Sequence, residues 1–525
     1  MTRHPESEPQ TESAPARWQA VVPCLYLPLL LLMVVAYSWR PLHSTQDVWS
    51  HAAVGRWIWQ HGAFPHQTLF LWSAKVDWVA HSWLTQLTYY SLLANGGPWL
   101  VIAVKVALVC AVFGLLWRLW ARGARVTVLT PFLFSLAVQC SRNRFASPRP
   151  EQFSALFFVL LLGALACWPT KNSQEKTGVA KVGFLALPAL FCLWANFHGG
   201  VAMGLVALAV FVVCDFAQSR GADESRKLAV VAVLCLAAVF INPYGWKYLA
   251  ALGQVNSNTF AQLDEWKPFW QVPFVPLEFV INIGLLCLLA WMAWILNPQR
   301  RWAWAGLLLT MTWFFMQSRR HIWLLAVVCL AVAATNAASL DTEHLWRELK
   351  RSRDAVIPEL LRGLARLGVV ACLLVWTLVA LPADLFPLRP VSNPPDALLD
   401  FLENNPRPGR LLSDFNISGV LEWRFGEKTL LFLDVLNAYP DHLMAEYADI
   451  FTGRTNGLAK LNDWQVGTVI IRSPKRDLNE RWPALAVQLE VSPAWKRVHT
   501  DDTGAVWQRV RGLNQNPAAL PKKTP

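Results

Sequence analysis

The sequence is poor in charged residues for its length. Only 16% of its 525 residues are Asp, Glu, Lys or Arg, whereas 54% are hydrophobic, and the mean hydropathy is +0.31. A soluble globular protein usually carries about 25% charged residues, so this composition argues against a soluble enzyme. The hydrophobic excess also excludes an intrinsically disordered chain, which needs low hydrophobicity and high net charge.

Several sequence patterns are also missing. The ten cysteines form no CxxC pair and none follows Cys372, so neither a disulfide framework nor a zinc site is indicated. The sequence contains neither nucleotide-binding fingerprint, GxGxxG or GxxxxGK[ST]. The histidines lack the i, i+4 or HxH spacing that favours metal binding, so we expect no metal and no cofactor.

Long apolar runs and 29 tryptophans dominate what is present. Tryptophan favours the membrane–water interface, and runs near 20 residues are long enough to span a bilayer. The fold class that we predict is a polytopic α-helical membrane protein of about 11 transmembrane helices, followed by a soluble α/β domain at the carboxyl end. The candidate spans are 21–39, 98–120, 126–141, 151–168, 182–197, 200–217, 226–241, 275–296, 301–317, 321–340 and 363–382.

The composition divides the chain into regions. We predict a disordered lead (1–20), a transmembrane domain (21–382) with an outer loop (40–97), a Pro-rich linker (383–408), an extracytoplasmic α/β domain (409–512) and a disordered tail (513–525). In the outer loop, the amphipathic stretch 82–96 fits a helix in the membrane interface. In the tail domain we expect strands at 430–433 and 468–471, and a β-hairpin around Asp501–Gly504.

Charge counting orients the chain. With the amino terminus inside, the inner segments carry roughly twice as many Lys and Arg as the outer segments of similar total length. The outer loop and the tail domain are then both predicted to lie outside the cytoplasm.

Polar residues that hydropathy does not explain collect on this outer side. An acid, Asp47, follows the first span directly and opens the outer loop. The candidate substrate-binding residues are Trp49, His51, Arg56, His81, Arg142, Arg149, Asn196, His198, Asn242, Tyr244, Glu265, Arg319, Arg320 and His321. The inner loops show ordinary Lys and Arg clusters, so the outer side is the predicted site.

These residues lie in motifs that resemble those of the GT-C membrane glycosyltransferases, most closely a bacterial branch described as RgtA/B/C/D-like. In order, the motifs are D-x-W-x-H from Asp47, Trp78–Leu84, Arg149–Gln152, Trp194–Gly200, Asn242–Gly245, Glu265-Trp266 and Arg319-Arg320. Gly409–Leu412, Ser418–Trp423 and Leu433-Asp434 of the tail are similar to that branch as well. The resemblance covers the chain from residue 21 to about 510.

The resemblance implies an inverting transfer of a sugar from a polyprenyl-phosphate carrier to a glycan, lipid or protein acceptor outside the membrane. The implied location is the bacterial inner (plasma) membrane, as part of cell-envelope synthesis. Asp47 would be the general base. The outer arginines would hold the carrier phosphate through their fork-shaped donors, and the loop tryptophans would contact sugar rings. Membrane lipids are the other expected partners, and nucleic acid is not one.

Each residue also has a structural interpretation. Asp47 is suited to capping the helix that follows it, an arginine at a membrane surface meets lipid headgroups, and His198 is suited to hydrogen bonding at a helix end. Most tryptophans fit an interface belt. Asp47 follows Gln46, so a single acid stands where the protein mannosyltransferases have an Asp-Glu pair. The DxD or ExD metal motif of oligosaccharyltransferases is missing from the later loops.

Two other functions remain open at this stage. One is a transporter of lipids or glycans, for which ionisable residues inside spans would be evidence. Lys105, Asp215 and Glu278 are the main ones here. The other is a non-catalytic membrane scaffold whose outer domain binds a partner.

Overall fold

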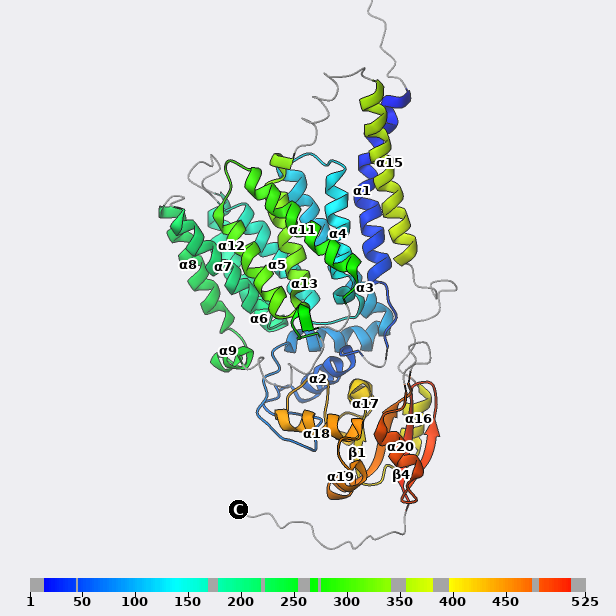
Figure 1. Cartoon of the computed structure of the whole chain (residues 1–525). Helices are drawn as coiled ribbons and strands as arrows, with labels where there is room; N and C mark the ends of the chain where they lie inside the picture. Colours follow the sequence, from blue (N-terminus) through cyan, green and yellow to red (C-terminus); the bar gives the residue numbers. More distant parts are fainter. Residues whose placement is uncertain are drawn as a thin grey trace, which may run out of the picture. The chain divides into compact units, whose positions relative to one another are not determined.

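The computed structural model describes residues 14–43, 46–168, 178–218, 222–253, 265–271, 275–340, 356–380, 396–474 and 481–510 (Figure 1). The chain forms two compact units. We call Met1–Arg40, Ile102–Gly245 and Leu263–Arg389 the helical unit. Pro41–Val101, Trp246–Gln262 and Pro390–Pro525 form the mixed unit. The predicted tail and residues 1–13 of the predicted lead lie outside the described residues, whereas residues 14–20, predicted to be disordered, form the start of helix α1.

Apolar helices build the helical unit. They are α1 (Ala14–Ser38), the later part of α3 (Trp83–Gly123), α4 (Leu129–Ala146), α5 (Glu151–Ala166), α6 (Gly178–Phe197), α7 (Val201–Ala217), α8 (Ala222–Val239), α11 (Leu277–Leu296), α12 (Trp302–Gln317), α13 (Ile322–Thr335) and α15 (Val356–Ala380). Short 3₁₀ turns are η2 (Phe269–Gln271), η3 (Arg319–His321) and η4 (Ala337–Leu340). Each of the eleven predicted spans overlaps one of these helices.

Helix α13 forms the centre of the helical unit. Every residue from Ile322 to Ala334 is buried, and the helix packs against α4, α5, α11 and α12. Outer helices instead expose large apolar side chains, as at Leu185, Val233 and Leu288. An apolar exterior of this kind suits a bundle surrounded by lipid.

By length and composition, two helices in the described part of the chain could cross a membrane, α3 and α11. Five apolar helices are shorter: Val22–Ser38, Glu151–Ala166, Leu185–Phe197, Val201–Ala217 and Gly363–Val379. The number of spans therefore stays a prediction.

A glycine divides α3 into two segments. Gly97 has φ 63° and ψ −163°, a conformation that residues with a side chain rarely adopt, and Pro98 follows it. The amphipathic stretch before Gly97 is thereby separated from the apolar stretch after it. This is the division predicted at 82–96 and 98–120.

The mixed unit combines the first outer loop with the tail. Its helices are α2 (Val48–His61), the start of α3, α9 (Trp246–Gly253), α16 (Asp396–Asn404), α17 (Ser418–Phe425), α18 (Asp441–Thr452), α19 (Gly457–Asp463) and α20 (Ala484–Val491). Two 3₁₀ turns flank α17, η6 (Phe415–Ile417) and η7 (Gly426–Lys428).

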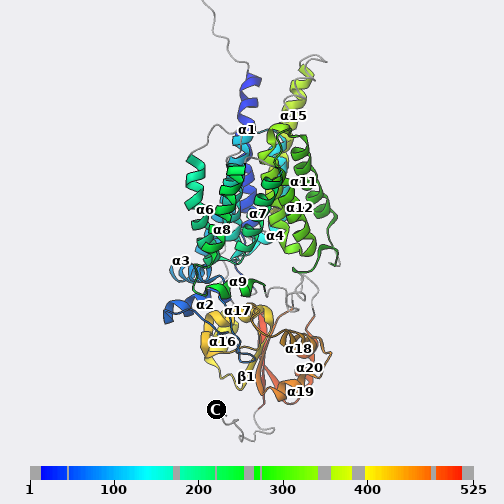
Figure 2. The same cartoon turned by 90° about the vertical axis from the view of Figure 1, so that its left-hand side faces the viewer.

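Four strands form its sheet: β1 (Arg410–Ser413), β2 (Val466–Arg472), β3 (Trp495–Thr500) and β4 (Gly504–Arg509). They lie in the order β1-β2-β4-β3, with β1 parallel to β2 and the other pairs antiparallel. Figure 2 shows α18, α19 and α20 on one side of the sheet and α16 on the other. The β3–β4 hairpin is confirmed, and Asp501 Oδ1 accepts hydrogen bonds from the Thr503 and Gly504 amides in its turn.

The loop and tail are joined by backbone and side-chain contacts. Helix α2 packs on α17 so closely that a Cβ on Gly419 would lie 2.9 Å from Ser50 Oγ. The Leu431 amide donates to the Phe70 carbonyl, and the Trp72 amide donates to the Leu431 carbonyl. The predicted division placed the loop with the spans, whereas the apolar face of α2 is buried on the tail.

Two local predictions are wrong. Residues 396–404 of the predicted linker form α16, because Leu398, Leu399 and Leu402 bury against the sheet; residues 383–395 lie outside the described residues. Residues 430–433 form only an isolated bridge from Leu431 to Leu71 rather than a strand of the sheet.

A buried ion pair fastens three helices of the helical unit. Arg301 Nε donates to Asp215 Oδ1 at 2.8 Å, and Nη2 bonds to Oδ2 of the same carboxylate. Arg301 Nη1 donates to the Leu165 carbonyl, and the guanidinium lies over the Phe211 ring. Both charged side chains are 6% exposed, so each depends on the other.

We therefore expect Asp215→Asn to lower the melting temperature of the purified full chain. Leaving Arg301 buried without its carboxylate costs about 3–5 kcal/mol, whereas the double change with Arg301→Met removes both charges and costs less. Lys227→Gln, which breaks the half-exposed Lys227–Glu224 pair, is the control and should change little. A melting curve for Asp215→Asn that matches wild type would show that the pair does not hold these helices.

Candidate functional site

Three arginines converge on two glutamates in the helical unit. Glu265 Oε2 accepts from Arg144 Nη1 and from Arg149 Nη1, each at 2.7 Å. Glu151 Oε2 accepts from Arg144 Nη2 at 2.5 Å. Arg320 lies 3.8 Å from Glu151 and 3.9 Å from Glu265. We call these five residues the arginine cluster.

Local sequence explains how these side chains meet. Arg144 ends α4, while Arg149 precedes Pro150 at the start of α5. The Gln152 side chain closes this turn. Its Oε1 accepts from the Arg149 backbone amide, and its Nε2 donates to the backbone carbonyls of Arg144 and Ser147. The two arginines are thus held one turn apart.

The opposite side of the cluster is fixed by backbone pairing. The Arg320 amide donates to the Glu265 carbonyl, and the Arg319 amide donates to the Lys267 carbonyl. The Arg320 guanidinium lies 4.0 Å from the centre of the Trp266 ring. The Glu265-Trp266 and Arg319-Arg320 motifs, far apart in the sequence, therefore form one piece of structure.

The cluster brings three guanidiniums and two carboxylates together. Burial acts to raise the pKa of Glu265, but Arg149, Arg144 and Arg320 together hold that pKa well below its usual range. A carboxylate so stabilised is a weak base, and Glu265 is suited to orienting arginines rather than accepting a proton.

Other predicted site residues of the helical unit have different surroundings. Burial, and then the charge of Arg320, lower the pKa of His321 to about 4, so its ring is neutral near neutral pH. Arg319 stands beside it in η3. Arg142 does not join the arginine cluster; its guanidinium lies 5.9 Å from the centre of the Tyr37 ring.

Two further motifs form turns. His198 Nδ1 lies 2.7 Å from Ser154 Oγ and accepts from the Gly200 amide, the helix-end role that the sequence offered as an alternative. Asn196 donates to the Cys192 and Ile241 carbonyls.

Asn242 Oδ1 accepts from the Tyr244 amide, which closes the Asn-Pro-Tyr-Gly turn, and Tyr244 itself is buried. These contacts make both the Trp194–Gly200 and the Asn242–Gly245 motifs parts of the scaffold.

In the mixed unit, Asp47 stands at the N-cap position of α2. Its side chain makes no capping hydrogen bond, so capping does not account for this residue. His51 lies one turn further on, with its ring 6.3 Å from that of Tyr89. His81 lies in the turn that precedes α3.

Trp49 and Arg56 are placed differently from the prediction. Trp49 is 1% exposed and donates to the His43 carbonyl, so its ring supports α2 and offers no face to a sugar. Arg56 Nη2 donates to the Glu422 carbonyl and its guanidinium lies over Trp423, which fastens α2 to α17. Trp59, by contrast, is 69% exposed.

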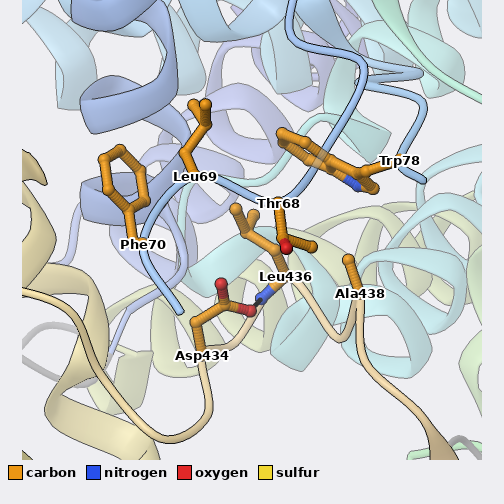
Figure 3. A pocket seen from close by; sticks show the side chains of 7 residues that line it. All are labelled: Thr68, Leu69, Phe70, Trp78, Asp434, Leu436 and Ala438. Atoms are coloured by element: carbon orange, nitrogen blue, oxygen red, sulfur yellow. Dashed lines mark hydrogen bonds between the residues drawn. The ribbon is translucent and has the colours of Figure 1, made fainter. Parts of the chain in front are cut away.

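Sequence reasoning missed a carboxyl pair in the mixed unit. Glu422 on α17 and Asp434 are both buried, and none of the described Lys, Arg or His side chains forms an ion pair with either. Figure 3 shows Asp434 beside Thr68, Leu436 and Trp78 in a small pocket. The Ser418–Trp423 and Leu433-Asp434 motifs were the available signals, but only the structure shows that both carboxyls are buried.

Burial and mutual repulsion keep a proton on this pair. Burial raises the pKa of Asp434 to about 7, against the opposing effect of hydrogen bonds from the Leu436 and Asn437 amides. Burial, and then the charge of Asp434, raise the pKa of Glu422 well above its usual range. Tyr439 is close enough to Asp434 for the charge of that carboxyl to act on its hydroxyl. On α2 the cation is Arg56, whose guanidinium donates to the Glu422 backbone carbonyl.

The pair should make stability depend on pH. Because both folded pKa values lie above the unfolded ones, the stabilisation is complete below about pH 4 and is lost as pH rises through about 7. The melting temperature of the full chain should therefore fall more steeply between pH 6 and 8 in wild type than in Glu422→Gln, which binds no proton. Half-exposed Glu446→Gln is the matched control. Equal slopes in all three proteins would contradict the uptake of a proton by Glu422 on folding.

Among the described residues, no group of three or more His, Cys, Asp and Glu side chains gathers as metal ligands. The ionisable residues inside the spans are explained by packing in part, since Asp215 pairs with Arg301. This removes one observation that would have favoured a transporter.

No protein-family model matches the chain, and no curated protein sequence matches it. Solved structures do. ArnT from Cupriavidus metallidurans in the apo state matches with a TM-score of 0.53 at 16% identity, over 95% of this chain and 99% of that one. The Archaeoglobus fulgidus oligosaccharyltransferase matches with a TM-score of 0.51 at 14% identity, over 85% and 68%.

The arabinofuranosyltransferase AftD from Mycobacteria matches with a TM-score of 0.55 at 15% identity, over 95% of this chain and 42% of AftD. These proteins are all GT-C glycosyltransferases, and the likeness runs through both units of the chain. At this level of identity a structural match shows the fold. The chain has the helical membrane-protein fold of the GT-C glycosyltransferases, as its motifs predict.

Proposed function

We propose that this chain is a membrane glycosyltransferase that moves a sugar from a polyprenyl-phosphate carrier to an acceptor outside the cytoplasm. The GT-C fold supports the class of enzyme. The observation that carries the proposal is the arginine cluster, because a glycosyl phosphate needs cations where its phosphate leaves.

The cluster is suited to a phosphate in charge and geometry. Its three guanidiniums favour an anion, and guanidinium forks match phosphate oxygens in pairs. The Arg149 and Arg320 side chains keep 27% and 21% of their surface exposed, whereas Arg144 keeps 11%. Arg149 and Arg320 would therefore contact the carrier, while Glu151, Glu265 and Arg144 hold them in place.

Asp47 would be the base. In an inverting transfer, an acceptor oxygen attacks the anomeric carbon, the bond from that carbon to the phosphate oxygen breaks, and the carrier phosphate leaves with the bonding electrons. The acceptor's proton goes to a carboxylate, here Asp47. Glu265 is disfavoured for this step by the three arginines that stabilise its charged form.

The sidedness follows from the charge distribution. The excess of Lys and Arg on the inner segments supports a membrane orientation with the first loop and the tail outside the cytoplasm. The bacterial inner membrane remains the proposed location.

Asp47→Asn should lower turnover by about 10²–10⁴-fold with little change in the melting temperature. Asn keeps the size of the side chain, and Asp47 makes no capping hydrogen bond that would be lost. Product formation from a lipid-linked sugar donor, measured beside a melting curve, tests this. Asp77→Asn, which removes an exposed acid of the same loop, is the matched control. Full activity in Asp47→Asn would eliminate it as the base.

Arg149→Lys and Arg320→Lys should each weaken binding of polyprenyl monophosphate about tenfold, because lysine keeps the charge and loses the fork. Arg226→Lys, at a 73% exposed position, should bind as wild type does. Equal affinities in all four proteins would argue against a phosphate clamp. Carrier binding without transfer from any lipid-linked sugar would favour the scaffold function instead.

A further inference from the structure

Helix α2, which begins beside Asp47, is held along its length by α17 and the turn that follows α17 in the tail. Both segments belong to the mixed unit. In the middle of α2, Arg56 Nη2 donates to the Glu422 carbonyl at 3.2 Å, across 366 residues of sequence. Near its end, Trp57 Nε1 donates to Glu427 Oε1 at 3.0 Å. The tail therefore supports α2 as far as its last turn.

The tightest contact lies in the first turn of α2. A Cβ built on Gly419 would lie 2.9 Å from Ser50 Oγ, 3.1 Å from the Ser50 nitrogen and 3.3 Å from Trp49 Cβ. Ser50 comes less than one turn after Asp47, whose carbonyl accepts from the His51 amide at 3.1 Å. Because this hydrogen-bonded turn joins the two residues, a shift of the backbone at Ser50 also moves Asp47.

A second support meets α2 further from Asp47. A Cβ on Gly55 would lie 2.0 Å from the Gln86 carbonyl oxygen, so α2 also packs closely on the start of α3. Gly55 lies about two turns after Asp47. Of these two supports, α17 is the one beside Asp47.

Helix α17 is itself fixed within the tail. Just before it, the Asp414 amide donates to the Ile470 carbonyl of β2 at 2.7 Å. The Phe415 amide donates to the Tyr447 hydroxyl on α18 at 2.8 Å. At the other end of α17, Arg424 pairs with two carboxylates of α16. The sheet and two helices of the tail thus determine where α17 stands, and α17 in turn supports the start of α2.

We infer that α17 is a positioning element for sugar transfer, because its contact with the first turn of α2 fixes Asp47 for the proton that leaves the acceptor. This inference rests on the proposed function, in which Asp47 is the general base. It gives the tail a role in the reaction itself, which differs from the binding of a separate partner. A base must lie within hydrogen-bond reach of its proton, and a displacement of about 1 Å can lower turnover about 10²-fold.

Gly419→Ala tests the inference, because it adds one methyl group at the tightest contact. It should lower kcat about 10–100-fold and leave the affinity for polyprenyl monophosphate at the wild-type value, since the arginine cluster is untouched. Gly284→Ala in α11 is the matched control, because a Cβ there meets nothing within 4 Å. Alanine favours a helix over glycine at both positions, so a difference between the two variants comes from the contact with α2.

A second change should partly restore the activity. Ser50→Ala, added to Gly419→Ala, removes the oxygen that the new methyl group meets first. Recovery of kcat should be partial, because the Ser50 nitrogen stays in place. A kcat that falls in Gly419→Ala together with the carrier affinity, and that Ser50→Ala does not raise, would indicate a general loss of structure and overturn the inference.

Hydrogen–deuterium exchange reports on α2 without any sugar transfer. The amides of residues 51–54 should exchange faster in Gly419→Ala than in wild type or Gly284→Ala, while those of α13 stay unchanged. Unchanged exchange at 51–54 would overturn the inference. Should Gly419→Ala fail to fold, Arg56→Lys weakens the same pair of helices, since lysine lacks the fork that bonds to Glu422, and carries the same two measurements.

Asp47→Asn separates this inference from the proposed function. If Asp47→Asn is inactive and Gly419→Ala is fully active, the base stands and the positioning role of α17 is wrong. If Asp47→Asn is fully active, Asp47 is not the base and the positioning role falls with it. Faster exchange in Gly419→Ala would then still show that α17 supports α2.

Discussion

The need to neutralise buried charge organises the helical unit. Glu265 is tolerated in partly buried surroundings because two arginines bond to the same carboxylate oxygen, and those arginines are tolerated because Glu265 and Glu151 bond to them. This mutual dependence joins the end of α4, the start of α5 and the 265–267 and 318–320 segments. The guanidiniums are then fixed in position before any ligand arrives, which is what electrostatic preorganisation requires.

Much of the fold follows from the sequence alone. Apolar run lengths predict each helix of the helical unit, and Gly97-Pro98 predicts the break in α3, since both signals depend on local chemistry. The hairpin around Asp501 is local as well. Long-range packing was not predictable in this way. Helix α16 looked like a linker because proline is frequent around it, and its burial is decided by distant strands.

For the candidate site, too, single residues could be predicted from the sequence and their long-range contacts could not. Asp47, Arg149, Glu265 and Arg320 were recognised because polar residues in outer segments have no hydropathic reason to be there. Their grouping was not predictable, since Glu265 meets Arg149 across more than 100 residues of chain. Trp49 was assigned to the site from its residue type alone. An aromatic ring in a polar loop suggests a sugar contact, but this side chain is 1% exposed and belongs to the core.

Helix α4 explains how one short segment serves two purposes. In the sequence Cys140-Ser141-Arg142-Asn143-Arg144, alternate arginines project to opposite faces because a helix turns about 100° per residue. On one face Arg144 meets two carboxylates and forms a rigid charged framework. On the other face the Arg142 guanidinium lies 5.9 Å from the centre of the Tyr37 ring on α1, the helix that packs against α4. Alternate arginines of one short segment therefore join α4 to the charged framework on one face and to α1 on the other.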